Sequence, residues 1–107
     1  MENRYSANGL QIHLVWITKY RYQVLQGKVQ LRCRDILREV RNSMDIQIIK
    51  SVASKDFNQL HLSYPPQLSF IEIVRRLKGL SSRLLLQEFL ELKRRYWGNL
   101  FWGIAYG

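Results

Sequence analysis

Two residues near the middle of the chain have the types and the spacing to bind a metal ion. Gln59 and His61 lie two apart in the run DFNQLHLSYPP (56–66), which alternates polar and apolar side chains as a strand with one solvated face does. Side chains two apart on a strand point to the same face, and an amide oxygen and an imidazole are both acceptable ligands for Mn²⁺. Gln59 and His61 are therefore a candidate cation site, and His13 in another strand could approach it. The stronger interpretation of both histidines is a hydrogen-bonded or solvated side chain on a half-buried strand.

Basic residues are the second group that could do chemistry, because Lys and Arg neutralise phosphates. The chain has 17 Lys plus Arg against 8 Asp plus Glu, a formal net charge of +9. The candidate DNA-binding residues are in three segments: Lys19 and Arg21; Arg75, Arg76, Lys78 and Arg83; and Lys93, Arg94 and Arg95. The third leads into Tyr96 and Trp97, and bases that stack on such rings gain about 1–3 kcal/mol each. The alternatives are a solvated helix face, core aromatic residues, or an anionic membrane as partner.

Composition limits the class of protein. A chain of 107 residues forms a single domain (1–107), because it is too short for two independent cores. Cys33 is the only cysteine, which excludes an intramolecular disulfide and a thiolate metal cluster. It falls on an apolar helical position, where we expect it in the core. No run approaches the roughly 20 apolar residues of a membrane span and MENRYSANG is no signal peptide, so we expect a cytoplasmic protein without a membrane partner.

The elements that must position these residues follow from hydrophobic periodicity. Alternation predicts strands, and apolar residues spaced by three and four predict helices. The predicted order is a strand at Leu10–Ile17, a helix at Lys28–Met44, strands at Ile46–Val52 and Phe57–Tyr64, a helix after Ser69 to about Glu88, and a strand at Asn99–Tyr106. This βαββαβ order predicts an α+β, ferredoxin-like (RRM-like) fold, an antiparallel sheet with two helices on one face.

Three local features refine these elements. The second and third strands are close enough in sequence to form a hairpin. Ser69 and Glu72 have the S-x-x-E spacing of a capping box at the start of the second helix. Gly79 interrupts that helix, which indicates either a bend or a close backbone contact.

Four segments together resemble a known family. HLVWITKYR (13–21), DFNQLHLSYPP (56–66), RRLKGLSSRLL (75–85) and FWGIAYG (101–107) resemble, in order and spacing, the small single-tyrosine (Y1, HUH) transposases of IS200/IS605 insertion sequences. The resemblance implies a homodimer formed by sheet pairing, to which the strand at Leu10–Thr18 could contribute. The dimer would bind DNA hairpins at the ends of a mobile element and cut and rejoin single-stranded DNA through a tyrosine-phosphate intermediate. It also implies Mg²⁺ or Mn²⁺ held by a His-hydrophobic-His triplet and a glutamine.

The chain departs from that family at the triplet. Aligned without a gap, the two histidine positions fall on Phe57 and Gln59. A shift of two residues instead matches the triplet to Gln59, Leu60 and His61, but needs a contraction before Pro65. We prefer the ungapped alignment, because the aspartate and both prolines then match. In either alignment the cation site is degenerate, and metal binding in this chain is expected to be weak or absent.

The second departure concerns the nucleophile. The family's C-terminal helix, with its tyrosine and glutamine, would follow the segment that ends at Gly107, so we expect the domain to lack it. An unactivated phenol has a pKa near 10 and needs nearby cations or a metal to act on a phosphodiester. Neither Tyr96 nor Tyr106 is therefore assigned a catalytic role.

Three functions remain open. The first is a transposase-family protein that binds single-stranded or hairpin DNA and is catalytically impaired. The second is an active strand-nicking and joining enzyme that uses Gln59, His61 and a tyrosine such as Tyr106. The third is a dimerisation partner that modulates an intact transposase without binding DNA.

Overall fold

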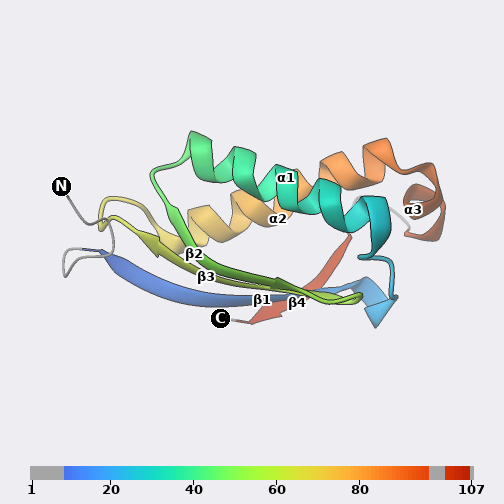
Figure 1. Ribbon diagram of the computed structural model, residues 1–107, viewed down its shortest axis with the longest axis horizontal. Helices are drawn as coiled ribbons and strands as arrows, with labels where there is room; N and C mark the ends of the chain where they lie inside the picture. Colours follow the sequence, from blue (N-terminus) through green and yellow to red (C-terminus); the bar gives the residue numbers. More distant parts are fainter. Residues whose placement is uncertain (1–8, 97–100, 107) are drawn as a thin grey trace.

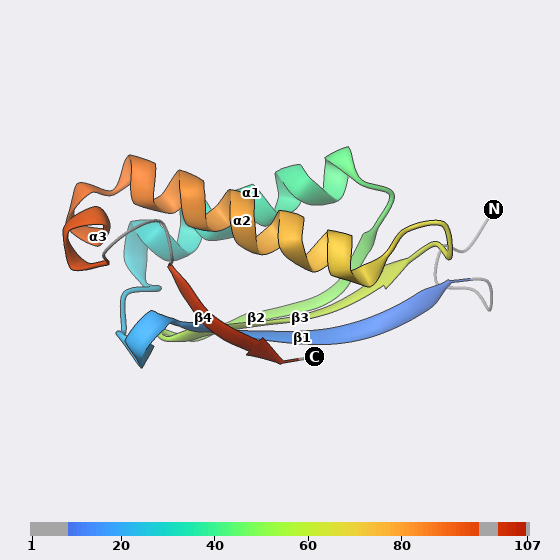
Figure 2. The same ribbon diagram turned by 180° about the vertical axis from the view of Figure 1, so that it is seen from behind.

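The fold is a four-stranded antiparallel sheet covered on one face by two long helices, as the sequence predicts. The computed structural model describes residues 9–96 and 101–106. Its elements are β1 (Leu10–Thr18), the short 3₁₀ helix η1 (Lys19–Arg21), α1 (Gly27–Ser43), β2 (Gln47–Ala53), β3 (Phe57–Tyr64), α2 (Phe70–Glu88), α3 (Leu90–Arg95) and β4 (Trp102–Tyr106). The strand order is β2-β3-β1-β4. Figures 1 and 2 show α1 and α2 side by side above the sheet, whose other face they leave open.

The core lies between the sheet and the helices. Every second residue of the central strands faces it, and Trp16, Leu60 and Leu62 are fully buried. Helix α1 contributes a stripe spaced by three and four that includes Cys33 and Ile36, because such residues share one helical face. The prediction that Cys33 is a core residue is confirmed, and burial raises the pKa of its thiol to about 12.

The first five predicted elements agree closely with the structure, but the last strand begins at Trp102 and not at Asn99, which lies outside the described residues; the helix α3 was not predicted, and one capping interaction was wrong. The β2–β3 hairpin and the start of α2 after Ser69 are confirmed. Ser69 is the N-cap residue of α2, yet its side chain makes no capping hydrogen bond. Ser69 is exposed, so water can satisfy the first amides of the helix in its place. A methyl group added to Gly79 would meet no atom of another element within 4 Å, which excludes a close backbone contact among the described residues.

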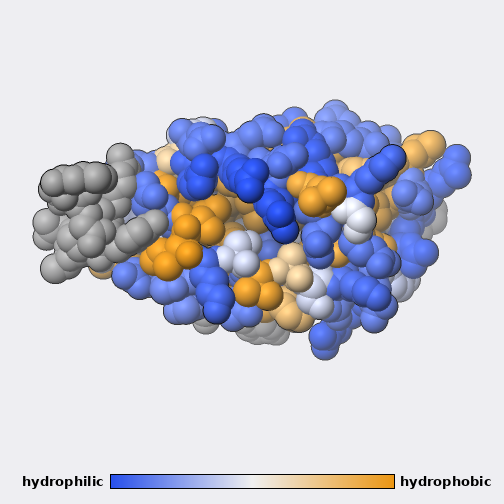
Figure 3. All heavy atoms as spheres, viewed as in Figure 1, coloured by the Kyte–Doolittle hydropathy of each residue, from blue (hydrophilic) through white to orange (hydrophobic). Residues whose placement is uncertain are grey.

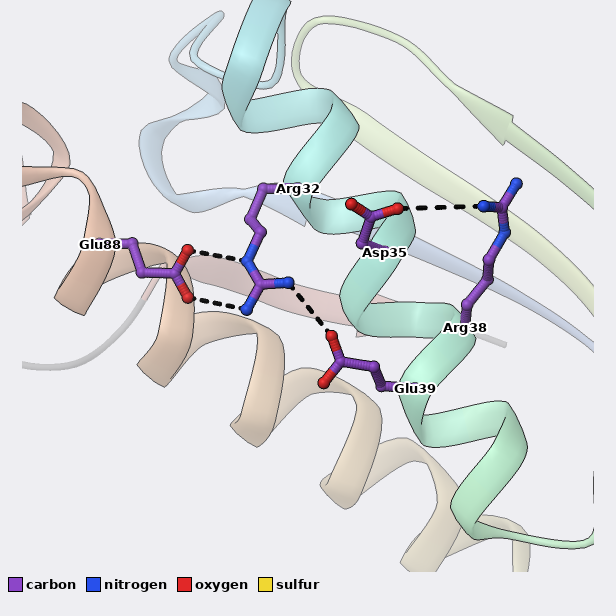
Figure 4. A network of polar contacts seen from close by, with 5 residues as sticks. All are labelled: Arg32, Asp35, Arg38, Glu39 and Glu88. Atoms are coloured by element: carbon purple, nitrogen blue, oxygen red, sulfur yellow. Dashed lines mark hydrogen bonds and ion pairs between the residues drawn. The ribbon is translucent and has the colours of Figure 1, made fainter.

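One ion-pair network joins α1 to the end of α2 (Figure 4). Arg32 donates to both carboxylate oxygens of Glu88, at 2.7 and 2.9 Å, and to Glu39 at 3.1 Å. The hydrogen bonds from Arg32 lower the pKa of Glu88. The network therefore stabilises the fold above the ordinary glutamate pKa and loses its effect as pH falls through the lowered value. Both side chains are partly exposed, so the contribution is about 0–1 kcal/mol.

Candidate functional site

The two histidines meet on the open face of the sheet. His13 on β1 lies directly opposite His61 on β3, and their rings stack with centroids 4.0 Å apart and planes at 14°. His61 Nε2 lies 2.9 Å from Gln11 Oε1, and an amide oxygen can only accept, so the ring nitrogen is the donor. The predicted approach of His13 to His61 is confirmed. The pair is engaged in stacking and hydrogen bonding.

Gln59 is further along the same face. It is exposed and lies opposite Val15 of β1, two residues along β3 from His61. Lys50 of β2 lies opposite His61 on its other side, and directly opposed residues of a sheet share a face. The ammonium group of Lys50 opposes the binding of a cation beside His61.

The side chains at the two positions that the ungapped alignment assigns to the histidines, Phe57 and Gln59, do not fit a divalent ion. Phe57 is half-buried and faces the same side as Gln59, but a phenyl ring supplies no ligand atom and Gln59 supplies one neutral amide. Over residues 9–96 and 101–106 there is no group of three or more His, Cys, Asp or Glu side chains that could hold a metal. The ligands that metal-assisted cleavage requires are therefore not brought together among the described residues.

Tyr96 does not resemble an activated nucleophile. Tyr96 is 1% exposed, and burial raises the pKa of its phenol to about 12, which disfavours the phenolate needed for attack. Tyr106 is the last residue of β4, where its backbone pairs with Val15.

Two of the predicted basic segments come together at one end of the molecule. Figures 1 and 2 both show η1 and α3 at this end. We call the group the end cluster, and its members are Lys19, Arg21, Lys93, Arg94 and Arg95 with the exposed rings of Tyr20 and Tyr22. The Arg95 guanidinium lies 4.8 Å from the centre of the Tyr22 ring, and Lys19 Nζ lies 5.2 Å from that of Tyr20. Arg21 also pairs with Asp56 at 3.2 Å.

Tyr20 and Tyr22 of the end cluster were not predicted from the sequence as DNA-binding residues. Tyr20 is 64% exposed and Tyr22 is 37% exposed, so their rings are available to stack on bases. The signal was present in the run KYRY (19–22), where cations and aromatic residues alternate. Of the two aromatic residues named from the sequence, Tyr96 is buried in the core and Trp97 lies outside the described residues.

The third basic segment is distributed along α2. Arg75, Arg76 and Arg83 are exposed there. Lys78 is half-buried, and its Nζ donates to the carbonyl of Gly103 in β4 at 3.4 Å. The structure therefore does not bring these four residues into one cluster with the end of the molecule.

Strand β1 is interior for only part of its length. Strand β3 pairs with it from Leu10 to Ile17, whereas its pairing with β4 begins at Val15. Among the described residues, nothing pairs with the other edge of β1 from Leu10 to Leu14. This edge offers backbone groups for pairing with another strand.

Comparison with known proteins places these features in a family. The family model described as "Transposase IS200 like" matches residues 6–107. The chain is 36% identical to the ISDra2 transposase TnpA of Deinococcus radiodurans over 97 residues, which are 91% of this chain and 69% of that protein. It is 31% identical to the transposase for insertion sequence element IS200 of Salmonella typhimurium over 94 residues, 88% of this chain and 62% of that protein.

Solved structures agree with the sequence comparisons. A crystal structure of a Deinococcus radiodurans protein assigned to the transposases superimposes with a TM-score of 0.84 and 31% identity, covering all of this chain (100%) and 85% of the other. Within the part of the chain that the structure describes, no helix has the length and apolar character to span a bilayer.

Proposed function

Because this chain belongs to the IS200-like transposase family, we propose that it binds single-stranded or hairpin DNA and does not complete strand cleavage through its own cation site. The observation that carries the binding is the end cluster, which combines five cations with two exposed tyrosine rings. The observation that carries the impairment is the pair Phe57 and Gln59 at the family's histidine positions, with His61 already engaged by Gln11 and His13.

The end cluster suits single-stranded DNA for two reasons. Lysine and arginine neutralise backbone phosphates and release counterions, which provides affinity without regard to sequence. Tyrosine rings stack on unpaired bases, which duplex DNA keeps inside its own stack. Both groups lie within one surface region, because Arg95 of α3 contacts the ring of Tyr22 that follows η1.

We expect the substitution of three α3 cations to weaken DNA binding. The variant K93Q/R94Q/R95Q should bind a labelled hairpin with a single-stranded tail about tenfold or more weakly than the unaltered chain. Its plot of log affinity against log salt should also be shallower, because fewer counterions are released. Fluorescence anisotropy at several salt concentrations measures both quantities.

A charge-matched control separates location from net charge. The variant R75Q/R76Q/R83Q removes the same charge from exposed positions on α2, outside the end cluster, and should retain most of the affinity. Equal losses in both variants would contradict a specific interface. Absence of DNA binding by the unaltered chain at low salt would support the third function, a dimerisation partner that modulates an intact transposase without binding DNA.

Cleavage is tested with the same labelled DNA and Mn²⁺ on a denaturing gel. We expect no covalent protein–DNA adduct. An adduct would show that the chain is an active strand-nicking enzyme.

A homodimer is part of this proposal, and it would use the open edge of β1. The edge from Leu10 to Leu14 can pair with the same edge of a second copy, because antiparallel pairing is self-complementary about a twofold axis. Light scattering should then give twice the 12.8 kDa mass of the chain. The variant I12P should shift the mass toward the monomer, since proline removes an amide hydrogen and is poorly tolerated within a paired strand. A monomeric unaltered chain at high micromolar concentration would contradict the dimer.

A further inference from the structure

A cavity lies between α1 and the β2–β3 hairpin, away from the end cluster and the histidine pair. Its volume is about 270 Å³. Part of its wall is apolar and includes Leu25, Leu37 and Ile48. Sites for small molecules typically combine apolar walls with a few polar groups, and their volumes begin at about 300 Å³. This cavity is therefore just below the lower end of that range, which suits a small ligand.

The polar group deepest in this wall is Asn58 of β3. Asn58 is 2% exposed, and its Nδ2 has no hydrogen-bond partner in the structure. It lines the cavity and lies between Trp16 of β1 and Ala53 of β2 in the sheet. An unpaired buried amide is costly, and a small rotation of the Asn58 side chain would bring this donor to an acceptor atom in the cavity.

Three arginines provide positive charge beside the cavity. Arg34, Arg38 and Arg41 line it, and their spacing of four and three places them on one face of α1. Figure 4 shows Arg38 on the side of the helix turned away from α2. In Figure 3, hydrophilic side chains extend along this side of the molecule above apolar ones.

The charge of these arginines is only weakly compensated. Arg38 is 3.9 Å from Asp35, and Arg41 contacts the neutral side chain of Asn42 at 3.4 Å. Among the described residues Arg34 makes no ion pair. By contrast, Arg32 on the α2 side of the helix binds two carboxylates at 2.7–3.1 Å. The two sides of α1 thus differ: one holds α2 in place, and the other has cations available for an anion.

We propose that this cavity binds a small organic anion. An aromatic ring or short apolar group contacts the apolar wall, a phosphate or carboxylate contacts the arginines, and an acceptor atom receives a hydrogen bond from Asn58 Nδ2. Arginine suits such groups because its donors match the geometry of phosphate and carboxylate oxygens. The proposal depends on neither DNA binding nor the cation site, so failure of the proposed function leaves it unchanged.

Phenyl phosphate is a suitable probe, because it unites a ring with a phosphate. It should bind about tenfold or more tightly than inorganic phosphate, since only the ester places apolar surface against the cavity wall. In ¹⁵N-resolved NMR spectra the side-chain amide signals of Asn58 should shift on titration. Isothermal calorimetry gives the two affinities.

Two single substitutions test the location. R38Q should weaken phenyl phosphate binding about tenfold, because it removes a charge-assisted contact at the cavity. R76Q removes the same charge from an exposed site on α2 and should leave binding unchanged. Both positions are exposed, so neither variant threatens folding.

Three results would overturn the proposal. Equal affinity for phenyl phosphate and inorganic phosphate would show that the apolar wall takes no part. Equal losses of phenyl phosphate affinity in R38Q and R76Q would indicate general electrostatic attraction. Amide signals of Asn58 that do not shift would show that the probe does not contact this residue. Full displacement of the probe by an oligothymidylate without a terminal phosphate would instead make the cavity part of a DNA interface.

Discussion

The double substitution F57H/Q59H is expected to raise the affinity of this chain for Mn²⁺ about a hundredfold, because imidazole is a good ligand for this ion and ligands held by one element act together. The two positions are separated by one residue on β3 and share the open face with His61. Their cross-strand neighbours Ile17 and Val15 are apolar, so no existing ion pair must break. The double substitution thus supplies the ligands that the present side chains lack.

Calorimetry with MnCl₂ measures this gain, and paramagnetic broadening of the amide signals of Val15 and Ile17 locates the ion. The single variants F57H and Q59H are the controls, and each should gain much less than the double variant. A double variant that binds no better than either single one would refute the ungapped alignment. In that case the alignment that places Gln59, Leu60 and His61 at the triplet becomes the better one.

The substitution S81A is expected to lower the free energy of unfolding by about 2 kcal/mol, because it leaves a buried donor without a partner. Ser81 is fully buried in α2. Its Oγ donates to the carbonyl of Leu77 at 2.6 Å and accepts from Trp102 Nε1 at 2.9 Å. The serine therefore connects α2 to β4 through a hydrogen bond that water cannot replace.

Urea denaturation measures the loss, and S69A is the matched control. Ser69 is on the same helix, but it is exposed and its side chain makes no capping bond, so S69A should change stability by less than about 0.5 kcal/mol. The variant W102F removes the indole N–H that donates to Ser81. The double variant S81A/W102F should lose less free energy of unfolding than the two single variants lose in sum. Strict additivity would contradict the coupling between Ser81 and Trp102.

The open face of the sheet is where the proposed loss of cleavage would arise. Family membership implies transposition of DNA, and the basic surface agrees with a DNA partner. In the ungapped alignment the two histidine positions hold a phenyl ring and an amide, and the nearby His61 is flanked by Lys50. These two observations support the proposal of DNA binding without cleavage.

The sequence by itself determined which face each residue of the regular elements occupies. Period-two alternation put His13 and His61 on the open face and Trp16 and Leu60 in the core, and helical spacing put Cys33 there. Such patterns are reliable because a strand or helix has one geometry, and the apolar side must be buried whatever the neighbouring elements are. The βαββαβ order then left few arrangements of the sheet.

Only the tertiary structure decided which distant residues touch. The contact of Arg95 with Tyr22, the bond from Trp102 to Ser81 and the unpartnered amide of Asn58 each depend on how separate elements pack. The capping box failed for a related reason: its spacing is local, but whether the serine bonds the helix or water depends on a small energy difference that periodicity does not report. Side-chain partners are set by three-dimensional packing, and spacing along the chain constrains only the face on which each partner is sought.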